Sequence, residues 1–221
     1  MKIEHCEFPD DLLYDPEGLV WARLLESGDV LVGITSIHAA LAGPVAKVSA
    51  KPLAASYPRH AAIGFLESGK YFGPIRTPVR GVLREVNTAV LARPRTLTDA
   101  SYDAGWFARL QPTNFHEDGR VLRSATDAHD GLTKQIAALR VRCFAAFPDH
   151  EMFEIGIECS AVLAKLNELL TRIEVGGVVH LVTDDPTSPI EMVRWSDQTG
   201  QPVIDQRKEG NLFHFLVRKV K

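Results

Sequence analysis

The sequence predicts an α+β protein with a β-rich N-terminal part and a small two-layer α/β C-terminal part. Short apolar stretches broken by turn signals fill residues 21–110, and many short strands with regular turns are typical of a small barrel or sandwich. From residue 152 onward, strand-like stretches alternate with amphipathic helical ones. That alternation predicts a second domain with helices packed on a sheet.

In the N-terminal part, residues 20–25 and 30–34 predict strands, with a turn at residues 26–29 between them. Residues 37–41 predict one helical turn. The further turn signals, each a pair rich in glycine, proline or serine, are Gly43-Pro44, Tyr57-Pro58, Ser68-Gly69, Gly73-Pro74 and Arg93-Pro94.

Residues 124–150 form the expected helical junction between domains at 1–123 and 151–221. Apolar residues recur at helical spacing from residue 131 to 147, and Pro148-Asp149 ends the pattern. The elements expected after it are a strand at 153–157, a helix whose apolar stripe runs to residue 173, a strand at 178–183, a helix at 189–198 and a strand at 211–217.

Composition and motifs exclude several classes. The chain has 221 residues and a formal net charge of −3, which argues against a protein that binds nucleic acid by neutralising phosphates. No apolar run has membrane-spanning length and the N-terminus lacks a signal-peptide core, so we expect a cytoplasmic protein. Cys6, Cys143 and Cys159 are odd in number and far apart, so neither a disulfide framework nor a zinc site is expected, and Cys6 and Cys143 are interpreted as structural.

Lys70 is the first candidate functional residue. It directly follows the turn-prone Ser68-Gly69 pair, after an apolar strand-like stretch. A lysine at a hairpin tip presents a primary amine that another enzyme can reach and convert into an amide. An exposed lysine is more often only a solvated charge, so the context must decide.

That context resembles the H protein of the glycine cleavage system and its lipoate-binding relatives over residues 21–112. The corresponding residues are Gly33-Ile34-Thr35, Glu67-Ser68-Gly69-Lys70, Pro78-Val79-Arg80-Gly81, Asn87, Pro94, Tyr102, Gly105, Trp106 and Pro112. The resemblance implies a lipoyl-type barrel-sandwich hybrid, lipoate attached covalently to Lys70, and Glu67 as a determinant for the lipoate-attaching enzyme. Gly69, Tyr71 and Phe72 depart from the family pattern, and the two aromatic residues favour a partner outside glycine cleavage.

Cys159 is the second candidate. It follows the strand expected at 153–157 and begins the expected amphipathic helix. Helix N-terminal amides stabilise a thiolate, which is a sulfur-accepting nucleophile. Glu158 opposes ionisation through like charge, and a buried inert cysteine is the alternative interpretation.

The segment around Cys159 resembles the TusA-like sulfur carriers over residues 153–219. The corresponding residues are Gly156-Ile157-Glu158-Cys159, Gly176, Asp184-Asp185-Pro186, Trp195 and the closing stretch 213–219. The resemblance implies a cysteine persulfide on Cys159. The family motif Cys-Pro-x-Pro is replaced by Cys159-Ser160-Ala161-Val162, so a docking module with a relic cysteine is an open alternative.

The two resemblances together imply a fused carrier that is a substrate of partner enzymes more than an enzyme. It would move sulfane sulfur between a lipoyl arm on Lys70 and a persulfide on Cys159, with sulfurtransferases or a heterodisulfide-reductase-like complex as partners. One alternative is a glycine-cleavage H protein that carries an aminomethyl group between the glycine cleavage enzymes. The other is a non-catalytic adaptor with two degenerate modules.

Overall fold

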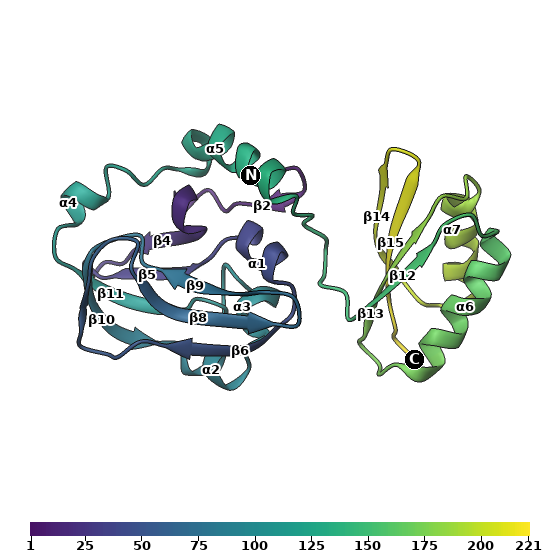
Figure 1. Cartoon of the computed structure of the whole chain (residues 1–221), viewed down its shortest axis with the longest axis horizontal. Helices are drawn as coiled ribbons and strands as arrows, with labels where there is room; N and C mark the ends of the chain where they lie inside the picture. Colours follow the sequence, from purple (N-terminus) through teal and green to yellow (C-terminus); the bar gives the residue numbers. More distant parts are fainter. The chain divides into compact units, whose positions relative to one another are not determined.

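The computed structural model describes residues 1–221, with the surroundings of residue 18 left out. The chain forms two compact units, Met1–Cys143 and Phe144–Lys221 (Figure 1). Helix α5, Ala125–Leu139, belongs to the first unit. Its Ala125, Ala128, Leu132 and Ile136 are buried in a core cluster of that unit.

The first unit contains three sheets (Figure 1). The largest has the strand order β3-β4-β5-β11-β10-β7, with bounds Leu13–Asp15, Val20–Leu24, Val30–Ile34, Ala108–Pro112, Gly81–Val86 and Ser56–Tyr57. The second has the order β6-β8-β9, with bounds Val45–Ala50, Ala62–Ser68 and Phe72–Arg76. Strands β1, Lys2–Ile3, and β2, Cys6–Glu7, form a small hairpin.

Glycines allow close packing inside this unit. A Cβ added at Gly64 on β8 would lie 2.3 Å from the Phe107 ring, so the ring just before β11 packs directly on the β8 backbone. A Cβ at Gly33 on β5 would lie 2.4 Å from the Trp21 indole on β4. Trp21 and Phe107 are both fully buried. These two bulky side chains therefore fill space in the core that side chains at Gly33 and Gly64 would otherwise occupy.

Helices connect the strands of this unit, and polar side chains cap the N-termini of several of them. Thr35 caps α1, Ser36–Ala42, by accepting the His38 amide. Asn87 caps α2, Thr88–Ala92, and Ser124 caps α5 in the same way. The remaining short helices are η1, Pro16–Gly18, α3, Thr96–Asp99, and α4, Phe115–Asp118.

Two local predictions for the first unit are wrong. Gly73-Pro74 lies inside β9, where Pro74 pairs with Phe65, and does not form a turn. Strand β9 is at the edge of its sheet, where a residue without an N–H is tolerated. The helix expected to start near residue 131 and to run into a strand or connector before residue 147 instead begins at Ala125, because Ser124 caps it earlier. It ends at Leu139, because Arg140 adopts a left-handed conformation.

The expectation of no disulfide is also wrong. Cys6 and Cys143 are bonded, with 137 residues of sequence separation and Cα atoms 5.0 Å apart. The bond joins the β1–β2 hairpin to the segment after α5, and both cysteines lie in the core cluster that contains Ile37 of α1. Sequence spacing gave no sign of this pairing, since only the fold brings the ends of the unit together.

The second unit is a four-stranded sheet with two helices on one face (Figure 1). Its order is β12-β13-β15-β14, with bounds His150–Glu154, Val178–Thr183, Leu212–Arg218 and Val203–Glu209. Strands β12 and β13 are parallel, and the other pairs are antiparallel. Helices α6, Cys159–Arg172, and α7, Ser188–Thr199, bury Val162, Leu166, Leu170, Met192 and Trp195 against the sheet.

Strand β14 is not among the expected elements. Its sequence, VIDQRKE, is mostly polar. An edge strand tolerates this composition because its side chains are partly exposed to solvent. The strand expected at 153–157 begins earlier, at His150, and ends at Glu154, and residues 155–157 turn toward α6.

Candidate functional site

Lys70 lies on the tip of the hairpin formed by β8 and β9. The last ladder pair is Glu67 with Phe72, and the Ser68 amide donates to the Tyr71 carbonyl at 2.8 Å. Gly69 and Lys70 are thus the two residues of the loop, and both are exposed. The tight loop fixes where the lysine side chain leaves the protein.

Ser68 holds this tip against helix α1. Its hydroxyl donates to the Ala42 carbonyl at 2.6 Å and accepts from the amides of Lys70, at 3.3 Å, and Tyr71, at 3.1 Å. Ala42 is the last residue of α1. One hydroxyl therefore orders both sides of the loop and ties it to the helix end.

The aliphatic stem of Lys70 crosses the backbone of Gly43. A Cβ at Gly43 would lie 2.8 Å from Cε and 3.4 Å from Nζ of Lys70, and Gly43 has a φ of 69°. Among the residues that the structure describes, no carboxylate forms an ion pair with the Lys70 ammonium group. The amine is consequently exposed and available for acylation.

Aromatic rings flank the tip. Tyr71 meets His38 of α1 edge to face, with ring centroids 5.7 Å apart. His38 is only 1% exposed, and burial lowers its pKa to about 4. Phe72 is 68% exposed and stacks on Phe65 at 5.7 Å. Tyr71 and Phe72 therefore make the surface beside Lys70 largely aromatic. Sequence reasoning missed that the buried His38 contacts Tyr71 and that Ser68 bonds to α1.

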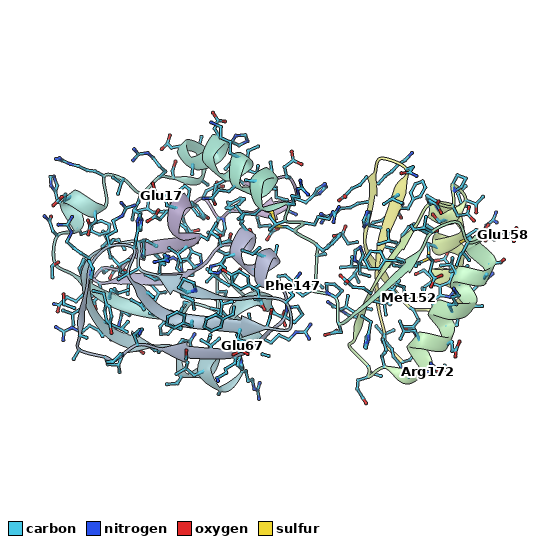
Figure 2. The ribbon with its side chains drawn as sticks, in the orientation of Figure 1. Glu17, Glu67, Phe147, Met152, Glu158 and Arg172 are labelled. Atoms are coloured by element: carbon cyan, nitrogen blue, oxygen red, sulfur yellow. A yellow bond between two sulfur atoms is a disulfide. The ribbon has the colours of Figure 1, made fainter. Side chains whose placement is uncertain are left out.

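Glu67 lies three residues before Lys70 on the same hairpin and is exposed (Figure 2). The structure thus brings two of the predicted site residues, Lys70 and Glu67, to one tip. Cys159 is in the second unit, at the first residue of α6.

The structure places Cys159 in the buried state that the sequence left open as the alternative to a thiolate. The side chain is 5% exposed, and burial together with the carboxylates of Asp185 and Glu191 raises the pKa of the thiol to about 11. The Cys159 amide donates to Asp185 Oδ2 at 2.7 Å. Asp185 thus occupies the helix N-terminus that was expected to stabilise the thiolate, and Glu158 beside it adds no cap (Figure 2).

Asp185 remains ionised because its own partners favour the charge. Thr187 donates to Asp185 Oδ1 from its hydroxyl at 2.7 Å and its amide at 2.8 Å. These bonds, with that from Cys159, lower the pKa of the Asp185 carboxyl. A sulfur nucleophile at Cys159 would form only if this arrangement opened.

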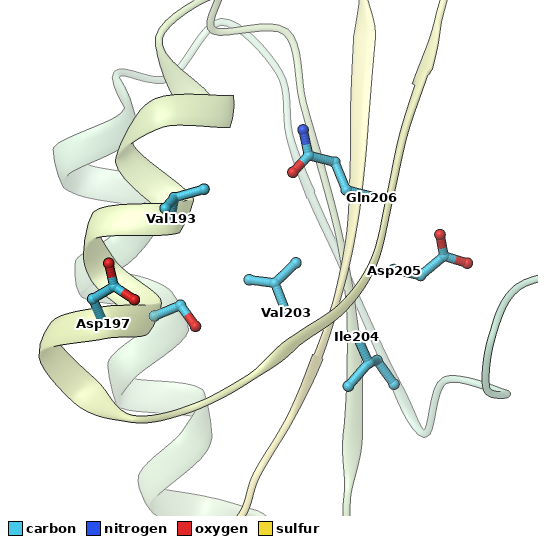
Figure 3. Close-up of a pocket in the computed structure, with 7 residues that line it drawn as sticks. Val193, Asp197, Val203, Ile204, Asp205 and Gln206 are labelled. Atoms are coloured by element: carbon cyan, nitrogen blue, oxygen red, sulfur yellow. The ribbon is translucent and has the colours of Figure 1, made fainter.

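The second unit also has a pocket of about 380 Å³ between α7 and β14 (Figure 3). Val193 and Val203 point into it from the helix and the strand. The other lining residues are Ser196, Asp197, Ile204, Asp205 and Gln206. None of Lys70, Glu67 and Cys159 lines this pocket.

The family model for the glycine cleavage H-protein matches residues 12–135 of this chain. The chain belongs to the glycine cleavage H-protein family. Proteins of this family carry lipoate attached covalently to a lysine, and the exposed amine of Lys70 fits such a group. The second unit, which begins at Phe144, lies outside the family match.

Several H proteins are similar over the same region. Glycine cleavage system H protein 2 of Aquifex aeolicus (strain VF5) is 33% identical over 138 residues, which cover 62% of this chain and 86% of the relative. H protein 5 of the same organism is 32% identical over 146 residues, covering 64% of this chain and 98% of the relative.

A solved structure has the same fold in the first unit. The crystal structure of a glycine cleavage system H protein from Mycobacterium marinum matches with a TM-score of 0.50 and 28% identity, over 57% of this chain and 99% of that chain. The H-protein-like fold expected for the N-terminal part is confirmed. Among the described residues, no helix is both long and apolar enough to cross a membrane.

Proposed function

We propose that this chain is a lipoyl carrier whose arm is attached to Nζ of Lys70. The observation that supports it is the exposed amine on a two-residue loop that Ser68 ties to α1. A rigid base under a flexible arm raises the effective concentration of the carried group at any docked enzyme. The chain then acts as a substrate of its partners.

Each residue at the tip has a proposed part. Acylation would convert the Lys70 ammonium group to a neutral amide, which the apolar surface of Tyr71 and Phe72 accommodates without an unpaired charge. Glu67 would offer its exposed carboxylate to the lipoate-attaching enzyme. Lipoate, when bound, supplies a dithiolane that can be reduced and can hold a group through sulfur.

Mass spectrometry of protein from a lipoylating host tests the attachment. We expect one lipoyl group on the peptide that contains Lys70, none in Lys70→Arg, and an unchanged level in Lys47→Arg, an exposed lysine on the adjacent strand β6. Glu67→Gln should slow lipoylation without changing its position. An unmodified Lys70 peptide would refute the proposal.

The cargo has two candidates. The relatives are named glycine cleavage H proteins, which favours a glycine-derived aminomethyl group and the glycine cleavage enzymes as partners. The second unit, outside the family match, favours sulfane sulfur and a TusA-like part for that unit, with sulfurtransferases or a heterodisulfide-reductase-like complex as partners. Burial of Cys159 requires that a sulfur-donating partner displace Asp185 first, and otherwise the second unit is an adaptor.

Two assays on lipoylated protein separate the cargos. Transfer of an aminomethyl group by an aminomethyltransferase, unaffected by Cys159→Ser, would support the first. Uptake of persulfide from a sulfurtransferase that Cys159→Ser abolishes would support the second. Persulfide on the arm that persists in Cys159→Ser would assign sulfur to Lys70 alone and leave the second unit as an adaptor.

A further inference from the structure

The outer face of the β8–β9 hairpin carries a pair of stacked aromatic rings beside the Lys70 tip. Buried and more exposed residues alternate along both strands, and the side chains that point away from the core are those of Phe65, Glu67, Phe72, Pro74 and Arg76. The rings of Phe65 and Phe72 have centroids 5.7 Å apart and planes 2° from parallel. Phe72 is 68% exposed, so the pair presents an aromatic surface to solvent.

The surroundings of the two rings order them. On the ladder, Phe65 pairs with Pro74 and Glu67 pairs with Phe72, so the rings are diagonal neighbours on one face. The Lys51 ammonium group lies over the Phe65 ring, 5.4 Å from its centroid, a distance at which a cation is attracted to the ring face. A side chain that is already ordered loses little conformational entropy when a partner binds it. Phe72 is therefore a prepared anchor for a partner.

Charged groups border the rings unevenly. Glu67 lies on the tip side, opposite Phe72. Lys51 follows the far end of β6, and Arg76 ends β9, where its Nη1 donates to the His60 carbonyl at 2.8 Å. Neither Lys51 nor Arg76 forms an ion pair with a carboxylate of the described residues. In a chain with a net charge of −3, this end of the face is locally positive and complements an acidic partner surface.

An enzyme that acylates Lys70 has to reach the loop above this face. Glu67 and Phe72 form the last ladder pair before the loop, and two residues along a strand span about 7 Å. Even a small transient interface, of about 600 Å² on each partner, has a radius of about 14 Å. An enzyme that contacts both Lys70 and Glu67 therefore also covers the stacked pair of Phe65 and Phe72.

We propose that the outer face of the β8–β9 hairpin is the docking surface for the lipoate-attaching enzyme, an inference that rests on the proposed attachment of lipoate to Lys70. The Phe72 ring enters an apolar pocket of the enzyme, and carboxylates beside that pocket face Lys51 and Arg76. Burial of an exposed aromatic ring supplies affinity, and the charges align the two surfaces. Phe72 and Lys51 are then specificity residues, because they select the enzyme without touching the reacting amine.

Steady-state lipoylation of the unmodified full chain tests the role of Phe72. The probe is the purified lipoate–protein ligase of the lipoylating host, with lipoate and ATP, and mass spectrometry follows the Lys70 peptide. We expect Phe72→Ser to raise KM at least about tenfold and to leave kcat within about twofold, as for a lost binding anchor. Phe72→Tyr, which keeps the ring, should retain the original KM. Leu24→Ser, at a 49% exposed position on β4, is the matched control and should also retain it.

A charge series tests the acidic rim of the enzyme. Lys51→Glu should raise KM at least about threefold and weaken its dependence on salt, because repulsion replaces attraction at the rim. Lys51→Arg should keep both KM and the salt dependence. Lys134→Glu, at an exposed position on α5, changes the net charge by the same amount and should leave KM unchanged.

The outcomes separate docking from attachment. Equal KM values for Phe72→Ser and the unchanged chain would overturn the docking proposal, as would a loss confined to kcat or a KM that Lys51→Glu leaves the same. Urea midpoints show that each variant is folded, and all these positions are exposed. If the unchanged chain took up no lipoate at Lys70, the proposed function itself would fail, which is a different result from normal lipoylation that ignores Phe72.

Discussion

A cysteine at the first turn of a helix becomes acidic only when the helix amides are free to face its sulfur. At Cys159 the amide is taken by Asp185, and the side chain is buried. Two carboxylates then oppose ionisation further. Burial and the two carboxylates therefore keep the thiol protonated at neutral pH, although the helix dipole by itself would favour the thiolate.

Replacing Asp185 by Asn tests this account of the thiol. The amide oxygen still accepts the Cys159 N–H, so the cap is kept while the charge is lost. We expect the pKa of Cys159 to fall from about 11 but to stay above the ordinary thiol value, because burial is the largest cause. Thiolate absorbance against pH measures it. Asp184→Asn, which removes a carboxylate bonded to Gly156, should leave the pKa in place, and an equal shift there would contradict the assignment.

His38 makes the first unit sensitive to acid. Its pKa is lowered to about 4 in the folded protein, against about 6.5 in the unfolded chain. The unfolded state therefore binds a proton first, so this stability is full above pH 6.5 and is lost as pH falls toward 4. The loss between about pH 7 and pH 5 should be roughly 2 kcal/mol.

Urea unfolding at the two pH values measures the effect of His38. His38→Leu, which keeps a buried side chain without a titrating group, should remove this part of the pH dependence. His150→Gln, at an exposed position on β12, should retain it. If the slope persists in His38→Leu, another group causes it.

At the scale of elements, the Lys70 tip depends on how the β8–β9 hairpin meets the end of α1. Ser68 bonds to Ala42, and Gly43 gives Lys70 room to cross the helix end. Gly69 shares the two-residue loop with Lys70. A Cβ added there would have no atom within 4 Å, and its φ is not positive. The two glycines thus differ in what they contribute, although both lie beside Lys70.

Alanine at each glycine tests this difference. Gly43→Ala should destabilise the first unit by about 1–3 kcal/mol, because its backbone conformation disfavours a side chain and the new Cβ meets Lys70 Cε. Gly69→Ala should be neutral or slightly stabilising, since it restricts the unfolded chain without a clash. Denaturant midpoints measure both. A loss at Gly69 equal to that at Gly43 would show that the tip geometry is wrong.

Element predictions succeeded where local pattern decides the structure. Residues 178–183 form β13 as expected, and the stripe from Val162 to Ile173 lies on or just after α6. They failed where the position in a sheet decides it. Pro74 is tolerated because β9 is an edge strand, and β14 is a strand because β15 offers it a ladder. Neither fact is visible in a window of residues.

At the scale of the whole molecule, two units with separate cores share one chain, and one disulfide closes most of the first unit. Reduction or Cys143→Ser should lower the free energy of unfolding of the first unit by about 2–5 kcal/mol, because the unfolded chain regains the freedom of a long loop. Calorimetry with and without reductant should show that transition shift while the second unit's stays. A shift of the second transition alone would refute this.

The sequence by itself determined the two-part organisation, the family of the first part and the loop that carries Lys70. These depend on local turn chemistry and on residues in a fixed order. Only the tertiary structure decided that Cys6 meets Cys143, that Cys159 is buried beside Asp185 and that His38 lies against Tyr71. Each of these pairs is distant in the sequence, and burial and long-range contact arise only when the elements pack.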